Sequence, residues 1–263
     1  MLFDLGKPVA LTVGPAGGGE PRQVAVVPLR SDLRLRYLDW VRRKRAQVHE
    51  LSGGRAGYVH VPDMVSEGWA DFSRDLRSEM LREAVIVDVR SNGGGHTSEL
   101  VIEKLNRHVI GWDNRRGMRS ATYPADSPRG PLVALADEFA GSDGDIVTAA
   151  IQALQLGPVV GTRTWGGVIG YDDEHELVDG TKMTVPRLSF WFETSGWGVE
   201  NYGVDPDVEV LMSPADWAAD RDTQLETAVR LALAAVAERP AARPPDVTTR
   251  PSRRRPPLPP RAR

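Results

Sequence analysis

Short apolar runs alternate with helix-like segments along most of this 263-residue chain, and this alternation limits the folds that it can adopt. Buried strands are predicted from apolar runs at 56–61, 84–89, 132–136 and 159–161. Helices are predicted between and after them at 65–83, 97–108 and 144–156. Strands joined through helices pair in parallel, with the helices crossing over the sheet. The sequence therefore predicts an α/β fold with a mostly parallel sheet and crossover helices.

Weaker patterns flank this region. Two strands, at 8–13 and 23–28, are joined by a glycine-rich turn, and a helix is predicted over about 32–51. An isolated hairpin is only marginally stable, so we expect residues 1–31 to be the last part of a small β domain. Further on, Asp179-Gly180 is typical of a hairpin turn, and 224–237 is predicted to be a closing helix.

Arginine and proline crowd the end of the chain. From Glu238 to Arg263 there are eight of each and two acidic residues, which gives this segment a net charge of +6 and the rest of the chain −9. Such a segment cannot bury enough apolar surface to offset its ordering entropy, and a solvated, disordered terminus is favoured over a dedicated binding role. We therefore expect three regions: 1–31, a main domain at 32–237, and a disordered tail at 238–263.

Composition also limits the partners and the location of the protein. No stretch approaches the ~20 apolar residues that span a bilayer, and the first residues do not resemble a signal peptide. The acidic core carries no known nucleic-acid-binding motif. We expect a cytoplasmic protein that contacts neither membrane nor specific nucleic acid.

Metal and thiol chemistry find little support in the sequence. The chain has no cysteine, which excludes disulfides, thiolate metal sites and a cysteine nucleophile. None of the five histidines forms a pair with convincing zinc-ligand spacing. We expect no metal and no cofactor.

A serine at a predicted strand-to-helix turn is the strongest candidate for chemistry. Ser142, in Gly-Ser-Asp-Gly-Asp at 141–145, stands where the apolar run 132–136 gives way to a helix. A helix N-terminus offers backbone N–H groups and partial positive charge, which can stabilise the oxyanion formed when a serine attacks an amide. An ordinary helix cap is the alternative interpretation.

Three other features are weaker candidates on their own. The turn at 92–95 (Asn-Gly-Gly-Gly) follows a buried strand and suits either an oxyanion hole or a flexible turn. Asp113 lies in a connection expected to pass over the strand ends, where it would either select a basic substrate side chain or pair with a neighbouring arginine. Glu200, in a loop rich in glycine and aromatic residues, would orient another polar group or be structural.

A serine hydrolase ordinarily needs a histidine close to its nucleophile, and no histidine here stands out. His60 is expected to be structural. His96, the histidine nearest the glycine turn, is the one that we would test as a base.

Taken in order, several motifs show that the chain resembles the C-terminal region of the tricorn-type serine peptidases, relatives of the C-terminal-processing peptidases in family S41. The similarity runs from about residue 35 to 237 and rests on the motifs at 57–64, 87–95, 141–145, 161–167 and 198–207. The resemblance implies a ClpP/crotonase-like core that hydrolyses peptides. It also implies that the strands at 8–28 end a PDZ-like domain, and that the chain forms homo-oligomers.

The resemblance also implies roles for individual residues. Ser142 matches the nucleophile, and the N–H groups of Gly95 and Asp143 match the oxyanion hole. Glu200 matches the glutamate that orients the catalytic histidine through an intervening serine, and Asp113 matches the acid that favours a basic residue before the cut.

One departure from the family pattern concerns the general base. The family's catalytic histidine and its serine partner lie in a helical domain before the PDZ-like domain, so no residue of this chain inherits that role. Relatives with a serine–lysine pair carry the lysine at the position of Gly167, and Lys104 and Lys182 do not fall on that motif. We therefore expect either a tricorn-type peptidase module whose base comes from upstream residues or another chain, or a catalytically incomplete, peptide-binding module.

Overall fold

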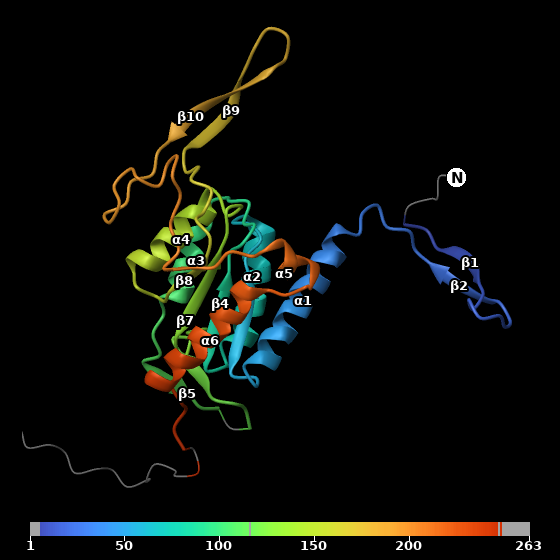
Figure 1. Cartoon of the computed structure of the whole chain (residues 1–263), viewed down its shortest axis with the longest axis horizontal. Coiled ribbons are helices and arrows are strands. Elements are labelled where there is room, and N and C mark those ends of the chain that lie inside the picture. The colour runs from blue at the N-terminus through green and yellow to red at the C-terminus, as the bar shows by residue number, and fades with distance from the viewer. Residues whose placement is uncertain (1–5, 116, 247, 249–263) are drawn as a thin grey trace, which may run out of the picture. The chain divides into compact units, whose positions relative to one another are not determined.

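The structure is a computed structural model that describes residues 6–115, 117–246 and 248, apart from the side chains of 173 and 174 (Figure 1). It divides into two compact units, 1–44 and 45–263, which are described separately here. Most of the predicted tail, at 247 and from 249 on, lies outside the described residues.

The first unit contains one antiparallel hairpin. Strands β1 (Val9–Val13) and β2 (Arg22–Val26) pair with Val9 opposite Val26, and most of their residues are exposed. Helix α1 (Leu33–Leu51) begins in this unit and continues into the second. Both predicted strands and the helix are confirmed, whereas the origin of the hairpin in a PDZ-like domain stays a prediction.

A five-stranded parallel sheet forms the centre of the second unit. Its strands are β3 (Ala56–His60), β4 (Ala84–Asp88), β7 (Leu132–Ala136), β8 (Val159–Gly161) and β11 (Val208–Glu209), in the order β11-β8-β7-β4-β3, with all neighbours parallel. Every residue of the first four is buried, which is why they are apolar along nearly their whole length rather than alternating with polar residues. The predicted parallel α/β fold is confirmed.

Helices cover both faces of this sheet. Helices α2 (Ser66–Glu79), α3 (Ser98–Leu105) and α4 (Asp143–Ala153) contribute to one core with alternate strand residues such as Val85 and Val87. Helix α6 (Thr223–Glu238) contacts β3, β4, β7 and β8, and its residues Leu225 and Val229 are buried. The sheet is therefore held rigidly between two helical layers, and the loops at its edges start from fixed points.

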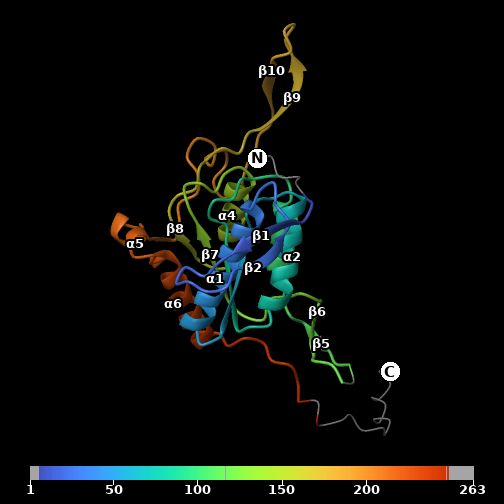
Figure 2. The ribbon, with the colours of Figure 1, turned by 90° about the vertical axis from the view of Figure 1, so that its right-hand side faces the viewer.

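Two hairpins and a short helix lie outside this framework. Strands β9 (Gly170–Glu176) and β10 (Lys182–Leu188) form an arm that stands out from the sheet and turns at the predicted Asp179-Gly180 (Figures 1 and 2). Strands β5 (Gly111–Asp113) and β6 (Ala121–Tyr123) form a second hairpin, and α5 (Pro214–Ala218) follows β11. The sequence did not predict β5, β6, β11 or α5.

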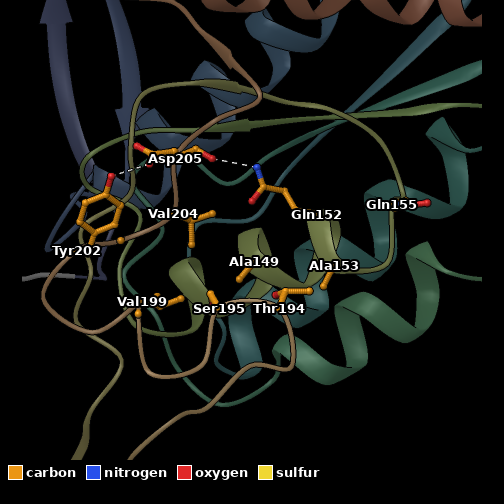
Figure 3. A pocket seen from close by; sticks show the side chains of 12 residues that line it. Ala149, Gln152, Ala153, Gln155, Thr194, Ser195, Val199, Tyr202, Val204 and Asp205 are labelled. Atoms are coloured by element: carbon orange, nitrogen blue, oxygen red, sulfur yellow. Dashed lines mark hydrogen bonds between the residues drawn. The ribbon is translucent and has the colours of Figure 1, made fainter.

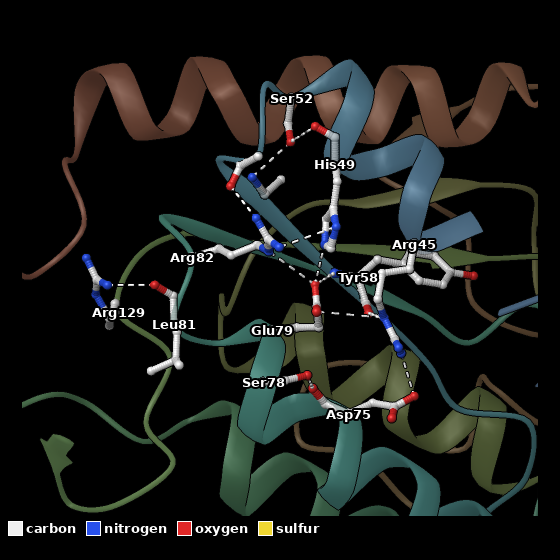
Figure 4. Close-up of polar contacts among 12 residues, drawn as sticks. Arg45, His49, Ser52, Tyr58, Asp75, Ser78, Glu79, Leu81, Arg82 and Arg129 are labelled. Carbon is white, nitrogen blue, oxygen red and sulfur yellow. Dashed lines mark hydrogen bonds and ion pairs between the residues drawn. The ribbon is translucent and has the colours of Figure 1, made fainter. Parts of the chain in front are cut away.

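A buried carboxylate ties the end of α1 to α2 and β3. Glu79 accepts a hydrogen bond from the Tyr58 N–H at 3.2 Å, contacts His49 Nε2 at 2.7 Å and pairs with Arg82 at 3.4 Å (Figure 4). Arg45, beside it, donates to Asp75 at 2.5 Å. These contacts account for His49 as a structural residue.

Candidate active site

Ser142 occupies a strained position at the start of α4. Its φ of 57° lies in the left-handed region, which a residue with a Cβ adopts only where the surrounding structure imposes it. The side chain makes no capping hydrogen bond, and its hydroxyl has no partner among the described residues. The helix-cap interpretation is therefore wrong, and a half-buried serine hydroxyl at a strand-to-helix turn is the arrangement known from nucleophile elbows.

The glycine turn after β4 lies directly against this serine. A Cβ added to Gly94 would come within 2.6 Å of Ser142 Cβ and 3.1 Å of its hydroxyl oxygen, so glycine is required for the approach. Asn92 fixes the turn, because its Oδ1 accepts from the Gly94 N–H at 2.8 Å and its carbonyl accepts from the Gly141 N–H at 3.0 Å. The two motifs that sequence placed about 50 residues apart thus form one surface.

Two backbone N–H groups beside Ser142 are available to a ligand. Neither the Gly95 N–H nor the Asp143 N–H has an acceptor within the part of the chain that the structure describes. Gly95 has no room for a side chain, since a Cβ would meet the Met64 carbonyl oxygen at 2.2 Å. The Asp143 carboxylate accepts from the Ser98 N–H at 3.1 Å, which ties it to the start of α3.

Asp145 and Glu200 together hold the loop that follows β8. Asp145 accepts from the N–H groups of Gly166 at 2.8 Å and Gly167 at 3.2 Å, and Glu200 Oε2 accepts from the next two, at 2.7 and 3.0 Å. Burial raises the pKa of Asp145, and its hydrogen bonds oppose that rise. Glu200 Oε1 has no partner among the described residues, so one oxygen of this carboxylate is open to a further donor. Four consecutive amides are thereby fixed between α4 and Glu200.

Trp165 lies against Gly141, the residue that precedes the serine. Its N–H donates to the Ala140 carbonyl at 3.0 Å, and the edge of its ring covers Gly141 and Gly167. A Cβ at Gly167 would come within 2.2 Å of the ring. The indole therefore leaves no room for a side chain at Gly167, the position at which the resemblance would place a lysine.

Asp113 lies near the amino ends of the strands, away from Ser142. The expectation that it lies over the carboxyl ends of the strands is therefore wrong for a single chain. Its neighbour Trp112 lies 6.0 Å from Arg129, which donates to the Leu81 carbonyl, just before β4 begins. Ser142, in contrast, follows the end of β7. Asp113 pairs with Arg115 at 2.9 Å.

The two histidines that flank the site differ in burial. His60 is buried in β3 with Nε2 at 3.0 Å from the Arg90 carbonyl, and burial lowers its pKa, which fits the structural role expected of it. His96 is exposed, and its backbone N–H donates to the Met64 carbonyl. Neither the His60 side chain nor the His96 side chain forms a hydrogen bond with the Ser142 hydroxyl.

A cavity of about 470 Å³ lies along the far half of α4 (Figure 3). It is lined by Ala149, Gln152 and Ala153 of the helix and by the loop that carries Tyr202 and Asp205, and it does not include Ser142. Among the described residues, no three histidine, aspartate or glutamate side chains lie where they could hold a metal ion. None of the helices that the structure describes is long and apolar enough to cross a membrane.

The sheet, the serine at its carboxyl edge and the flanking glycine turn define a class of protein. Residues 55–210 match the family described as Peptidase family S41, and the chain belongs to this family. It is 63% identical over 242 residues to tricorn protease homolog 1 of Streptomyces coelicolor, covering 92% of this chain and 23% of the relative. It is 46% identical over 212 residues to the tricorn protease of Thermoplasma acidophilum, covering 81% of this chain and 20% of that protein.

A solved structure shows the same fold. The crystal structure of the tricorn protease superimposes with a TM-score of 0.83 at 43% identity, over 88% of this chain and 22% of the other. The chain thus spans about a fifth of the length of the curated relatives that it matches.

Sequence reasoning missed two residues of this site. Asp145 is an acidic residue in the first turn of a helix, where carboxylates are common, so nothing in the sequence pointed to its partners 21 and 22 residues away. Trp165 carried a signal in retrospect, because a large aromatic residue stood next to a glycine pair in a motif of the resemblance.

Proposed function

We propose that this chain is the nucleophile-bearing module of a tricorn-type serine endopeptidase. The observation that carries the proposal is the strained backbone of Ser142 at the N-terminus of α4, next to two N–H groups that have no acceptor among the described residues. The assignments of Ser142, Gly95, Asp143, Glu200 and Asp113 all belong to this proposal.

In the proposed reaction, the Ser142 oxygen attacks the carbonyl carbon of a peptide bond. The resulting oxyanion accepts hydrogen bonds from the Gly95 and Asp143 N–H groups, which the α4 N-terminus supplements with partial positive charge. A base takes the hydroxyl proton and delivers it to the leaving amine as the C–N bond breaks, and water then hydrolyses the acyl-enzyme. This chemistry needs no metal or organic cofactor.

The base itself is proposed to come from outside residues 1–263, either from a preceding segment or from another chain. Glu200 supports this view, because Oε2 is bound by two amides while Oε1 faces no partner among the described residues. The free oxygen would receive the hydroxyl that orients the incoming histidine.

Asp113 is proposed to select a basic residue before the cut. Since it lies at the sheet edge away from Ser142, it would serve the site of a second copy of the chain, in keeping with the homo-oligomer that we propose. We also propose a cytoplasmic location, and no contact with specific nucleic acid.

A second candidate is a catalytically incomplete module that binds peptides and assembles with a partner. It is favoured by the Ser142 hydroxyl, with which no side chain of the described residues forms a hydrogen bond.

Reaction with a fluorophosphonate probe separates these candidates. We expect slow labelling of one residue, Ser142, that is abolished by Ser142→Ala and kept by Ser91→Ala, a control whose backbone also has a positive φ. Added imidazole should accelerate the labelling, because it replaces the missing base. Labelling at another residue, or none even with imidazole, would contradict the peptidase proposal, and in the second case peptide binding would favour the incomplete module.

A further inference from the structure

Trp165 is exposed although it lies next to the candidate nucleophile. It is 67% exposed, among the most exposed of the large apolar residues. Its surroundings hold it in place: its N–H donates to the Ala140 carbonyl at 3.0 Å, and the next residue is bound by the buried Asp145. A tryptophan that is exposed on a fixed backbone offers a preformed apolar surface to a ligand, unlike a residue of a flexible loop.

The ring reaches close to Ser142 because two glycines make room for it. Its Cε3 atom lies 2.7 Å from the position that a Cβ of Gly141 would take, and its Cζ3 atom lies 2.2 Å from that of Gly167. Since consecutive Cα atoms are about 3.80 Å apart, the ring edge lies within about 8 Å of the Ser142 Cα. At roughly 3.3 Å per residue, an extended peptide cut at Ser142 passes the ring within two or three residues of the cut.

From this geometry we propose that Trp165 is the apolar wall of a substrate subsite. It receives a large apolar side chain, preferably aromatic, from a residue within two or three positions of the peptide bond that Ser142 attacks. This proposal rests on the proposed function and adds a preference that is independent of the acid at Asp113, since that residue lies at the other edge of the sheet.

The groups around Ser142 favour a peptide side chain as the ligand that packs against Trp165. The glycine turn and the Asp143 amide beside Ser142 offer polar backbone groups, which bind a peptide's main chain. The indole offers an apolar ring face close to them, because a carbon edge of its ring lies against the two glycines and most of the residue is exposed. Groups that suit the main chain and an apolar side chain of one substrate therefore lie close together at the serine.

Peptide binding to the full chain with Ser142→Ala, which prevents turnover, tests the subsite. The probes are fluorescein-labelled heptapeptides of alanine and serine in which one phenylalanine is moved through the sequence, with binding followed by fluorescence anisotropy. We expect phenylalanine at one position to raise affinity about ten-fold, as burial of one aromatic side chain allows. Adding Trp165→Ala should remove this gain, Trp165→Phe should keep part of it, and Trp217→Ala, an equally exposed tryptophan on α5, should leave it intact.

Each outcome bears on a separate claim. A phenylalanine gain that survives Trp165→Ala, or no gain in the parent chain, overturns the subsite while the peptidase proposal stands. Failure of every peptide to bind the parent overturns the peptide as substrate class and the subsite with it. Thermal unfolding of each variant shows that a lost gain does not come from a lost fold.

Discussion

Gly94→Ala places a methyl group directly against the proposed nucleophile, which makes it the sharpest test of the site. Gly94 has a φ of +80°, and the new Cβ would lie 2.6 Å from Ser142 Cβ. Gly93→Ala is a matched control, because a Cβ added at Gly93 would have no atom within 4 Å and the residue has no positive φ.

Two physical terms set the size of the effect. Alanine in the left-handed region costs about 1–2 kcal/mol, which corresponds to a fall in the melting temperature of roughly 2–8 °C for a domain of this size. Carbon atoms in contact are normally about 3.5–4.0 Å apart, so Ser142 or the turn has to move by about 1 Å. A displacement of that size at a reacting atom is expected to slow fluorophosphonate labelling about 100-fold.

The assay compares labelling rates in the presence of imidazole with melting temperatures for both alanine variants. We expect Gly93→Ala to match the parent in both measurements and Gly94→Ala to lose more in labelling than its stability loss explains. If the two variants behave alike, the turn does not contact Ser142 as described, and the assignment of the oxyanion hole loses its geometric basis.

Three further changes test the surroundings of the site. Asp145→Ala should cost about 3 kcal/mol or more in urea unfolding, since it removes several hydrogen bonds to a carboxylate, including those from the Gly166 and Gly167 N–H groups; it should also speed amide exchange at 166–167, and unchanged exchange would refute its role in fixing that loop. The pKa of His60 is lowered by burial, so the unfolded chain binds a proton below about pH 6.5 that the folded chain does not. Stability should thus fall on acidification by up to about 1.4 kcal/mol per pH unit, and His60→Gln should flatten this slope; an equal slope in both proteins would rule His60 out. Asp222→Ala breaks the buried pair with Arg90 and should cost about 3–5 kcal/mol, whereas Glu193→Ala, at an exposed position without a positive φ, should change stability by less than about 0.5 kcal/mol.

The central sheet could be predicted from sequence because burial determines its pattern. Strands β7 and β8 were predicted with their observed bounds, since both faces are covered and nearly every residue is apolar. The hairpin β5–β6 lacks such a pattern, because all of its strand residues except the buried Thr122 lie partly or fully in solvent, and β11 has only two residues. Strands of these kinds depend on tertiary contacts that a local pattern does not contain.

From the sequence alone, individual residues of the candidate site could be identified, but not which of them lie next to one another in the fold. Ser142 and the glycine turn were identified as separate motifs, and only the resemblance joined them before the structure placed Gly94 against the serine. The same resemblance could not indicate that Asp113 lies away from Ser142, because the order of motifs along a chain does not determine where their residues lie in the fold. The α4 carboxylate Asp145 and the ring of Trp165 make contacts with residues about 20 positions away along the chain, beyond the reach of any helix or strand periodicity.

The ring of Trp165 above Gly167 also has a consequence for how such peptidases diverge. A lysine introduced at Gly167 would meet the indole, so the ring would have to be displaced or replaced before the amine could approach the serine. A change at Trp165 alone would remove the proposed apolar wall, and a change at Gly167 alone would crowd the ring beside Ser142. Introducing a base at position 167 therefore requires two coupled substitutions rather than one.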